Sequence, residues 1–251
     1  MSFVLVTGAT GEVARGVLPY LESQFDLHLL APDLPGDDPR HIRADILDWQ
    51  ALSSAMQGAR AVLHLAVATG HSGIYEDDAF NDQRFEVNVK GTFHVFETAC
   101  RAGVQRVVQV SSLMVVWGYG KESLVAGDAP PKPVGNYALT KALSEAIARH
   151  YAENRGLEAI SLRIAAPLDL IDLHQRRKPI RPQQVPFVDL AQAFTKALIV
   201  PLPKYEIVTI VGDSSKRTWD LEPARRVLGY APDINLDDLG VPFADPFDVK
   251  S

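Results

Sequence analysis

Short apolar runs alternate with amphipathic segments along most of the chain. The first run, Phe3–Thr7, ends at a glycine, and the next segment, residues 12–23, places Val13, Val17 and Leu21 on one face of a predicted helix. Strands that are apolar along their whole length are typical of parallel sheets covered by helices on both faces. The pattern predicts a doubly wound α/β fold, with later strands at residues 27–30, 41–44, 61–67, 106–112 and 158–165.

The regular alternation stops after the last of these strands, where residues 167–186 are rich in proline and arginine. Further predicted elements follow: a helix at 188–198, a strand at 205–211 and a short helix at 219–230. We expect residues 1–165 to form the main domain and residues 166–251 a small C-terminal part. This part is expected to pack on the carboxyl ends of the strands, where doubly wound sheets bind ligands, and to help bind the substrate.

The turn between the first strand and the first helix has the sequence TGATGEVA. Gly8 and Gly11 lack the Cβ atoms that would keep a pyrophosphate away from the backbone N–H groups of the helix N-terminus. Ala14 takes the third glycine position, which faces helix–strand packing rather than phosphate. A simple tight turn is the alternative, but the position of this turn predicts a dinucleotide cofactor and makes residues 1–165 a Rossmann domain.

Asp33 follows the second predicted strand, 19 residues after Ala14. At about this offset a carboxylate accepts hydrogen bonds from the adenosine ribose, and it would repel the 2′-phosphate of NADP. We therefore predict NAD as the cofactor. A solvated turn carboxylate is the alternative for Asp33, because aspartate is common in turns. Asp45 is a candidate partner for the adenine amino group.

Tyr137 and Lys141, in the sequence NYALTK, are four residues apart and share one face of a predicted helix. A tyrosine, with a reference pKa of about 10, is almost wholly protonated at neutral pH, so a phenolate needs nearby positive charge. Lys141 would supply that charge, and the phenolate could take the proton of a substrate hydroxyl. Ser112 would hydrogen-bond the same oxygen. Spacing alone would equally suit a solvated helix face.

Composition and charge exclude several classes of function. The net charge is -6 and there is no long basic block, which argues against nucleic-acid binding. The seven histidines lack the spacing of metal ligands, so we predict no metal. No apolar run approaches the roughly 20 residues of a membrane helix. Met1 leads directly into a strand rather than a signal peptide, which predicts a cytoplasmic protein.

The ordered motifs TGATGEVA, HLA, NVKGT, VSS and YALTK resemble those of the extended short-chain dehydrogenase/reductase family, of the NAD-dependent epimerase/dehydratase type. The resemblance covers nearly the whole chain and implies a Rossmann fold, bound NAD and a catalytic set of Ser112, Tyr137 and Lys141. Asn88 matches the family's structural asparagine. The resemblance also implies a set of residues along the cofactor: Gly8, Thr10, Gly11, Glu12, Val13, Asp33, Asp45, Ile46, Leu65, Ala66, Val67, Asn88, Tyr137 and Lys141.

Two positions near the catalytic serine depart from many members of this family, which carry a hydroxyl residue at Leu113 and a tyrosine at Trp117. Ser112 precedes Tyr137 by 25 residues, which matches the usual separation. Ser111 stays open as the alternative, since adjacent strand residues face opposite sides.

The short C-terminal part and the segment SSLMVVWGYG most resemble uronate dehydrogenases. Arg181 falls where such enzymes place a carboxylate-binding arginine, and guanidinium pairs with carboxylate through two parallel hydrogen bonds. A solvated basic loop, together with Arg176 and Arg177, is the alternative. His71 and Ser72 are further candidates for substrate contact because their loop follows the fourth strand. Arg163, inside a strand, is expected to be buried and paired.

These features favour an NAD-dependent oxidoreductase that oxidises a hydroxyl of a small polar substrate, such as a sugar or sugar acid. Two alternatives stay open: a sugar-nucleotide epimerase or dehydratase that regenerates its NAD, and a non-catalytic NAD(P)-binding regulatory protein. The helices predicted around residues 85–101 and 137–153 carry apolar residues on more than one face. Relatives pair these helices, so we expect a homodimer.

Overall fold

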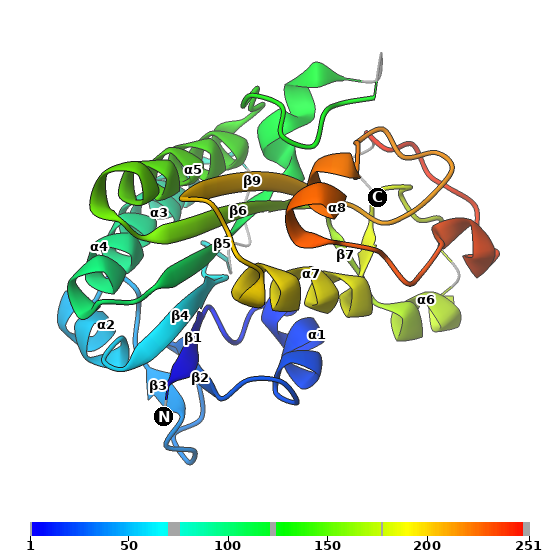
Figure 1. Ribbon diagram of the computed structural model, residues 1–251. Helices are drawn as coiled ribbons and strands as arrows, with labels where there is room; N and C mark the ends of the chain where they lie inside the picture. Colours follow the sequence, from blue (N-terminus) through cyan, green and yellow to red (C-terminus); the bar gives the residue numbers. More distant parts are fainter. Residues whose placement is uncertain (1, 70–75, 121–123, 177, 248–251) are drawn as a thin grey trace.

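The computed structural model describes residues 2–69, 76–120, 124–176 and 178–247. Its centre is a seven-stranded sheet with the order β3-β2-β1-β4-β5-β6-β9 (Figure 1), and every strand pair is parallel. The strands are β1 Phe3–Thr7, β2 Leu27–Ala31, β3 His41–Arg43, β4 Ala59–His64, β5 Arg106–Ser112, β6 Glu158–Ile164 and β9 Tyr205–Ile210.

Helices cover the two faces of this sheet, with one group on each side in Figure 1. One face carries α1 Glu12–Leu21, α7 Phe187–Ile199 and α8 Glu222–Leu228. The other carries α2 Trp49–Ala55, α4 Thr92–Ala102 and α5 Asn136–Arg155. The remaining helices are α3 Asp78–Arg84, the π-helix η1 Phe85–Gly91, the 3-10 helix η2 Leu113–Tyr119, α6 Leu170–Arg176 and the 3-10 helix η3 Leu236–Leu239. Among the described helices, none combines the length and apolar character needed to cross a bilayer.

Strand β1 shows why the sheet is covered twice. Its side chains alternate between the faces, and Leu5 belongs to the core under α2 and α4 whereas Val4 and Val6 belong to the core under α1 and α7. All three are buried. Both faces therefore exclude water, which confirms the doubly wound fold predicted from the continuous apolar runs.

Two predicted elements differ most from their limits in the structure. Strand β4 ends at His64, so Leu65, Ala66 and Val67 lie in the segment after it, where the chain passes close to Gly8. The last predicted helix begins only at Glu222 rather than at 219. A backbone bridge between Val125 and Trp219 keeps the residues before α8 extended and places the Trp219 side chain in the core.

The last third of the chain contributes to the main sheet as well as to a separate layer. Strand β9 pairs with β6, and α7 packs against α1. Outside the sheet, β7 Pro167–Leu168 pairs with β8 Val185–Pro186. A small apolar cluster of Leu168, Leu173, Ile180 and Leu236 holds this outer layer together beside the carboxyl edge of the sheet.

Candidate active site

Two neighbouring cavities lie at the carboxyl edge of the sheet. The glycine-turn cavity, of about 560 Å³, lies beyond β1, β2 and β4. The tyrosine cavity, of about 370 Å³, lies beyond β5 and β6. Leu65 and Val67 line both cavities, so the two lie side by side, and together they are called the groove. The groove is open to the carboxyl ends of the strands, where the fold was expected to bind its ligand.

Most residues predicted to hold the cofactor line the glycine-turn cavity: Gly8, Thr10, Gly11, Glu12, Asp33, Asp45, Ile46, Leu65, Ala66 and Val67. Val13 lines the tyrosine cavity instead. Residues from the ends of four strands are thus brought together in the predicted order. Arg15 and Gln83 also line this cavity, and no signal in the sequence distinguished them from surface residues.

The backbone of the glycine turn requires a glycine at position 8. Gly8 has a φ of 69°, and a Cβ there would lie 2.6 Å from the backbone of Ala66. Gly11 is the N-cap of α1 and has no side chain to accept from the first N–H groups of the helix. Because those groups have no partner within the helix and carry its positive dipole end, the turn is built for an anion such as a pyrophosphate.

Asp33 stands at the mouth of the glycine-turn cavity, two residues after β2. The hydroxyl of Thr10 donates to its Oδ1 atom over 2.6 Å, which fixes the exposed carboxylate against the glycine turn. The guanidinium of Arg15 donates to the Thr10 carbonyl. The Asp33 carboxylate is therefore held in place by a hydrogen bond and lines the cavity. This favours a ribose contact over a role as a solvated turn residue.

Asp45 and Ile46 form another part of the glycine-turn cavity, after β3. Asp45 is exposed, and its Oδ1 atom accepts from the backbone N–H of Leu47 over 2.9 Å. Ile46 is buried and packs where Gly91 has no side chain, since a Cβ at that glycine would lie 2.5 Å from its Cδ1 atom. This end of the cavity thus offers one apolar wall and one carboxylate, which suits a purine with an exocyclic amino group.

Buried His64 contacts Thr7, the last residue of β1 before the glycine turn. Its Nδ1 atom lies 2.7 Å from the hydroxyl of Thr7, and its Nε2 atom lies 3.0 Å from that of Thr92. The Thr92 hydroxyl donates to the carbonyl of Asn88, so it must accept from Nε2–H, which leaves Nδ1 to accept from Thr7. Burial lowers the pKa of His64 to about 3, so the ring is neutral. It links β1 to η1.

Asn88 joins the loop after β4 to helix α5. Its Oδ1 atom accepts from the backbone N–H of Ala68 over 2.8 Å, and its Nδ2 atom donates to the Thr140 hydroxyl over 3.0 Å. The side chain is buried on η1. Both ends of its amide are thus engaged within the protein, and the bond to Thr140 joins η1 to the helix that carries Tyr137 and Lys141.

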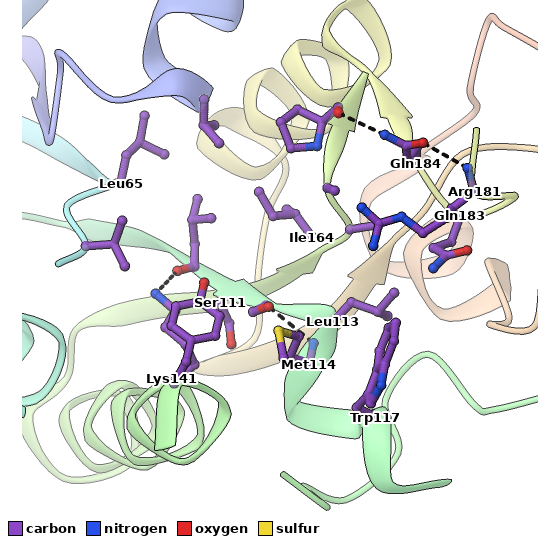
Figure 2. A pocket seen from close by; sticks show the side chains of 18 residues that line it. Leu65, Ser111, Leu113, Met114, Trp117, Lys141, Ile164, Arg181, Gln183 and Gln184 are labelled. Atoms are coloured by element: carbon purple, nitrogen blue, oxygen red, sulfur yellow. Dashed lines mark hydrogen bonds between the residues drawn. The ribbon is translucent and has the colours of Figure 1, made fainter. Parts of the chain in front are cut away.

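Tyr137 and Lys141 lie in the first two turns of α5 and both line the tyrosine cavity. Tyr137 is half-buried, whereas Lys141 is buried and its Nζ atom donates to the Val110 carbonyl over 2.6 Å (Figure 2). Burial lowers the pKa of Lys141 to about 8, an effect partly opposed by the nearby carboxylate of Glu145. At neutral pH this lysine is still mostly charged, so it can stabilise a phenolate.

The two serines at the end of β5 differ in their partners. The Ser111 hydroxyl donates to the Oε1 atom of Glu145 over 2.6 Å. The Ser112 hydroxyl oxygen accepts from the backbone N–H of Met114 over 3.2 Å at the start of η2, which leaves its own proton available to a ligand. Both line the tyrosine cavity. The bonding pattern favours Ser112 as the residue that contacts a substrate oxygen.

A buried ion pair anchors this end of α5 to the sheet. Arg163 on β6 makes two hydrogen bonds to Glu145, from Nε to Oε1 over 2.8 Å and from Nη2 to Oε2 over 2.7 Å. Both side chains are buried. The prediction that Arg163 is buried and paired is thereby confirmed, and the pair lies one helical turn beyond Lys141.

Arg181 lines the tyrosine cavity opposite Lys141 in Figure 2, with its guanidinium directed inward. Its backbone N–H donates to the side-chain oxygen of Gln184 over 2.8 Å, which shapes the loop. The other substrate candidates, His71 and Ser72, lie outside the described residues, as does Arg177.

Sequence reasoning missed several side chains that line the tyrosine cavity, among them Met114, Trp117, Gln183 and Gln184. Trp117 was visible only as a departure from related sequences. Its ring stacks on Trp219, with 5.7 Å between ring centroids, and also packs on Phe247 near the C-terminus. The two glutamines had no signal beyond their closeness to Arg181. These residues make one wall of the tyrosine cavity, assembled from segments far apart in the sequence (Figure 2).

Comparison with known proteins places these features in a family context. The family model described as the NAD-dependent epimerase/dehydratase family matches residues 4–168. The chain is 28% identical to L-arabinose 1-dehydrogenase (NAD(P)(+)) of Haloferax volcanii, covering 94% of this chain and 98% of that protein. It is 29% identical to uronate dehydrogenase of Pseudomonas syringae pv. tomato, covering 91% of this chain and 81% of that protein.

Solved structures show the same fold. Uronate dehydrogenase from Agrobacterium tumefaciens superposes with a TM-score of 0.80 at 22% identity, covering 99% of this chain and 92% of that one. Glucuronic acid dehydrogenase from Chromohalobacter salexigens superposes with a TM-score of 0.81 at 21% identity, covering 98% and 92%. The arrangement of sheet, helices and outer layer is therefore shared over nearly the full length of both chains.

Proposed function

Since the chain belongs to the NAD-dependent epimerase/dehydratase family, we propose that it is an NAD-dependent dehydrogenase that oxidises a hydroxyl group of a small sugar or sugar acid. One observation carries the proposal: the cavity at the glycine turn adjoins the cavity that holds Tyr137 and Lys141, with Leu65 and Val67 lining both. The relatives at 28% and 29% identity, matched over 94% and 91% of this chain, are dehydrogenases of arabinose and of uronates.

The residues of the groove fit NAD. The Cβ-free turn at Gly8 and Gly11 would take the pyrophosphate, Asp33 would take the adenosine ribose, and Asp45 with Ile46 would take the adenine. Leu65, Ala66 and Val67 would line the cofactor towards Tyr137 and Lys141, which would hold the nicotinamide ribose. When bound, NAD supplies the acceptor for the hydride that leaves the substrate carbon.

The chain's own side chains handle the proton. Ser112 donates its hydroxyl proton to the substrate oxygen and so positions it beside Tyr137. The Tyr137 phenolate takes the proton of the substrate hydroxyl. Charged Lys141 lowers the free energy of that phenolate, because it lies on the same helix face one turn further along.

Arg181 supports a sugar acid as the preferred substrate. Its guanidinium points into the tyrosine cavity from the side opposite Lys141, so a carboxylate bound there would place the rest of a monosaccharide towards the proton-transfer residues. Such a paired carboxylate would fix the sugar in one orientation. The cavity of about 370 Å³ has room for a monosaccharide.

The test is a panel of aldoses and uronic acids, with NAD and with NADP, in which NADH or NADPH formation is followed by absorbance. We expect steady NADH formation with at least one uronic acid and a preference for NAD. A product of inverted configuration without net NADH would favour the epimerase alternative. Tight NAD binding without turnover of any substrate would favour a regulatory protein.

We also propose that the protein is a homodimer. Phe85 on η1 and Leu139 and Leu143 on α5 are large apolar side chains with 40%, 39% and 37% of their surface exposed. Because η1 and α5 are in contact, these side chains can meet their counterparts across a two-fold axis. Light scattering at micromolar concentration tests this, and a monomeric mass would refute it.

A further inference from the structure

A buried cation outside the Ser112, Tyr137 and Lys141 set lies beside the reactive tyrosine. Arg84, the last residue of α3, is 1% exposed. Its guanidinium carbon lies 4.1 Å from the ring centroid of Phe80 and 5.8 Å from that of Tyr137. Both distances fall within the roughly 6 Å over which a cation is attracted to an aromatic face. The arrangement therefore joins α3 to the ring that transfers the proton.

The contacts of Arg84 connect it to the start of α5 by a second route. Its Nη1 atom donates to the Oδ1 atom of Asn81 over 2.9 Å and lies 3.6 Å from the Oε1 atom of Glu76. The other oxygen of Glu76 accepts from the side chain of Asn136 over 2.9 Å. Since Asn136 directly precedes Tyr137, one carboxylate contacts both the cation and the first residue of the catalytic helix.

We propose that Arg84 is a positioning residue for Tyr137. The guanidinium of Arg84 reaches Tyr137 from α3, where it holds the phenol ring and places a second positive charge beside it. The inference rests on the proposed function, because only a proton-transferring Tyr137 gives this charge a catalytic consequence. Lys141 acts on the same phenol from within α5. The two cations thus approach Tyr137 from different helices.

The charges around Tyr137 predict the direction in which each of them shifts its pKa. Lys141 and Arg84 favour the phenolate, and Arg181, which lines the same cavity, acts in the same direction. Glu76 opposes them, but it is 41% exposed and therefore screened by water. Arg84 should consequently lower the pKa of the Tyr137 phenol, and Glu76 should raise it by a smaller amount.

Three substitutions separate charge from packing. Arg84→Met removes the charge and keeps an apolar side chain against Phe80. Arg84→Lys keeps the charge. Glu76→Gln removes the opposing charge and keeps an acceptor for Asn136. The pKa of Tyr137 is measured from the ultraviolet absorbance of tyrosinate, with a matching Tyr137→Phe protein subtracted in each background so that the other tyrosines cancel. This readout needs neither cofactor nor substrate.

We expect the pKa of Tyr137 to rise by about one unit in Arg84→Met, to change little in Arg84→Lys, and to fall by a few tenths in Glu76→Gln. The pH dependence of kcat should move in the same directions. Shifts of opposite sign in Arg84→Met and Glu76→Gln support the proposal, because loss of packing alone would not produce them.

An unchanged pKa of Tyr137 in folded Arg84→Met would overturn the proposal, even if that variant lost activity. If circular dichroism shows that Arg84→Met does not fold, Glu76→Gln decides: an unchanged or raised pKa would overturn the proposal. The proposed function fails differently, since the expected pKa shifts would then appear in a protein that forms no NADH with any sugar or sugar acid.

Discussion

The two halves of the groove are built in different ways. The glycine-turn cavity is lined mostly by short segments that directly follow β1, β2, β3 and β4, with Gln83 and Val87 added from α3 and η1. The tyrosine cavity combines η2, the start of α5, the end of β6 and the loop that carries Arg181. The glycine-turn cavity could therefore be predicted from sequence motifs, whereas the tyrosine cavity depends on how distant segments pack against one another. Substitutions that affect one half and spare the other test this division.

The largest effect is expected at Tyr137, in the tyrosine cavity. Tyr137→Phe removes the proton acceptor and leaves the ring, so kcat should fall about a thousandfold. NAD affinity, measured by calorimetry, should change little, because the glycine-turn cavity is untouched. Turnover within a few fold of the original would show that another group moves the proton.

Lys141, in the same cavity, should make the stability of the folded protein depend on pH. Its pKa is about 8 in the folded protein and 10.5 for a lysine in water, so the folded chain binds fewer protons than the unfolded chain between these values. Stability relative to Lys141→Met should therefore rise by about 3 kcal/mol between pH 8 and pH 10.5. Urea unfolding at each pH measures it, with exposed Lys204→Met as the matched control. A flat difference would show that burial does not perturb Lys141.

Gly8→Ala tests the cofactor half alone. The new Cβ would lie 2.6 Å from the backbone of Ala66 at a φ of 69°, so the turn must open. We expect NAD affinity to fall about thirtyfold and stability by about 2 kcal/mol. Gly103→Ala is the control, because Gly103 has a similar φ of 74° but no atom within 4 Å of its Cβ position. Equal losses of NAD affinity in both variants would contradict a tight pyrophosphate turn at Gly8.

Arg181→Met tests the substrate half alone. Loss of a charged hydrogen-bonding partner should raise KM for uronic acids about twentyfold, corresponding to roughly 2 kcal/mol. KM for neutral aldoses and the affinity for NAD should stay within about twofold. A uniform rise for charged and neutral sugars would mean that Arg181 supports the loop rather than a carboxylate.

The smallest effect is expected at the exposed end of the cofactor half. Asp33→Asn removes the charge that repels a 2′-phosphate but keeps an oxygen for the Thr10 hydroxyl. The preference for NAD over NADP, taken as the ratio of kcat/KM values, should fall about fivefold, since an exposed charge is screened by solvent. An unchanged ratio would indicate that Asp33 is only a solvated turn carboxylate.

The sequence by itself determined the doubly wound fold and the main features of the glycine turn. Apolar runs at 3–7 and 106–112 match β1 and β5 in both limits. Gly8 and Gly11 were recognisable because they lie in the turn between the first strand and the first helix, where a missing Cβ lets a phosphate approach the backbone. The spacing of Tyr137 and Lys141 was likewise local, since a helix places residues four apart on one face.

Only the tertiary structure distinguished Ser111 from Ser112, and only it brought Arg84 to the ring of Tyr137. Ser111 meets Glu145 across 34 residues of chain, and Arg84 reaches Tyr137 from a different helix. Such contacts depend on the packing of whole elements against the sheet rather than on any periodicity within one element. The proton-transfer residues could thus be named from the chain, while the charges and walls that surround them were decided by the fold.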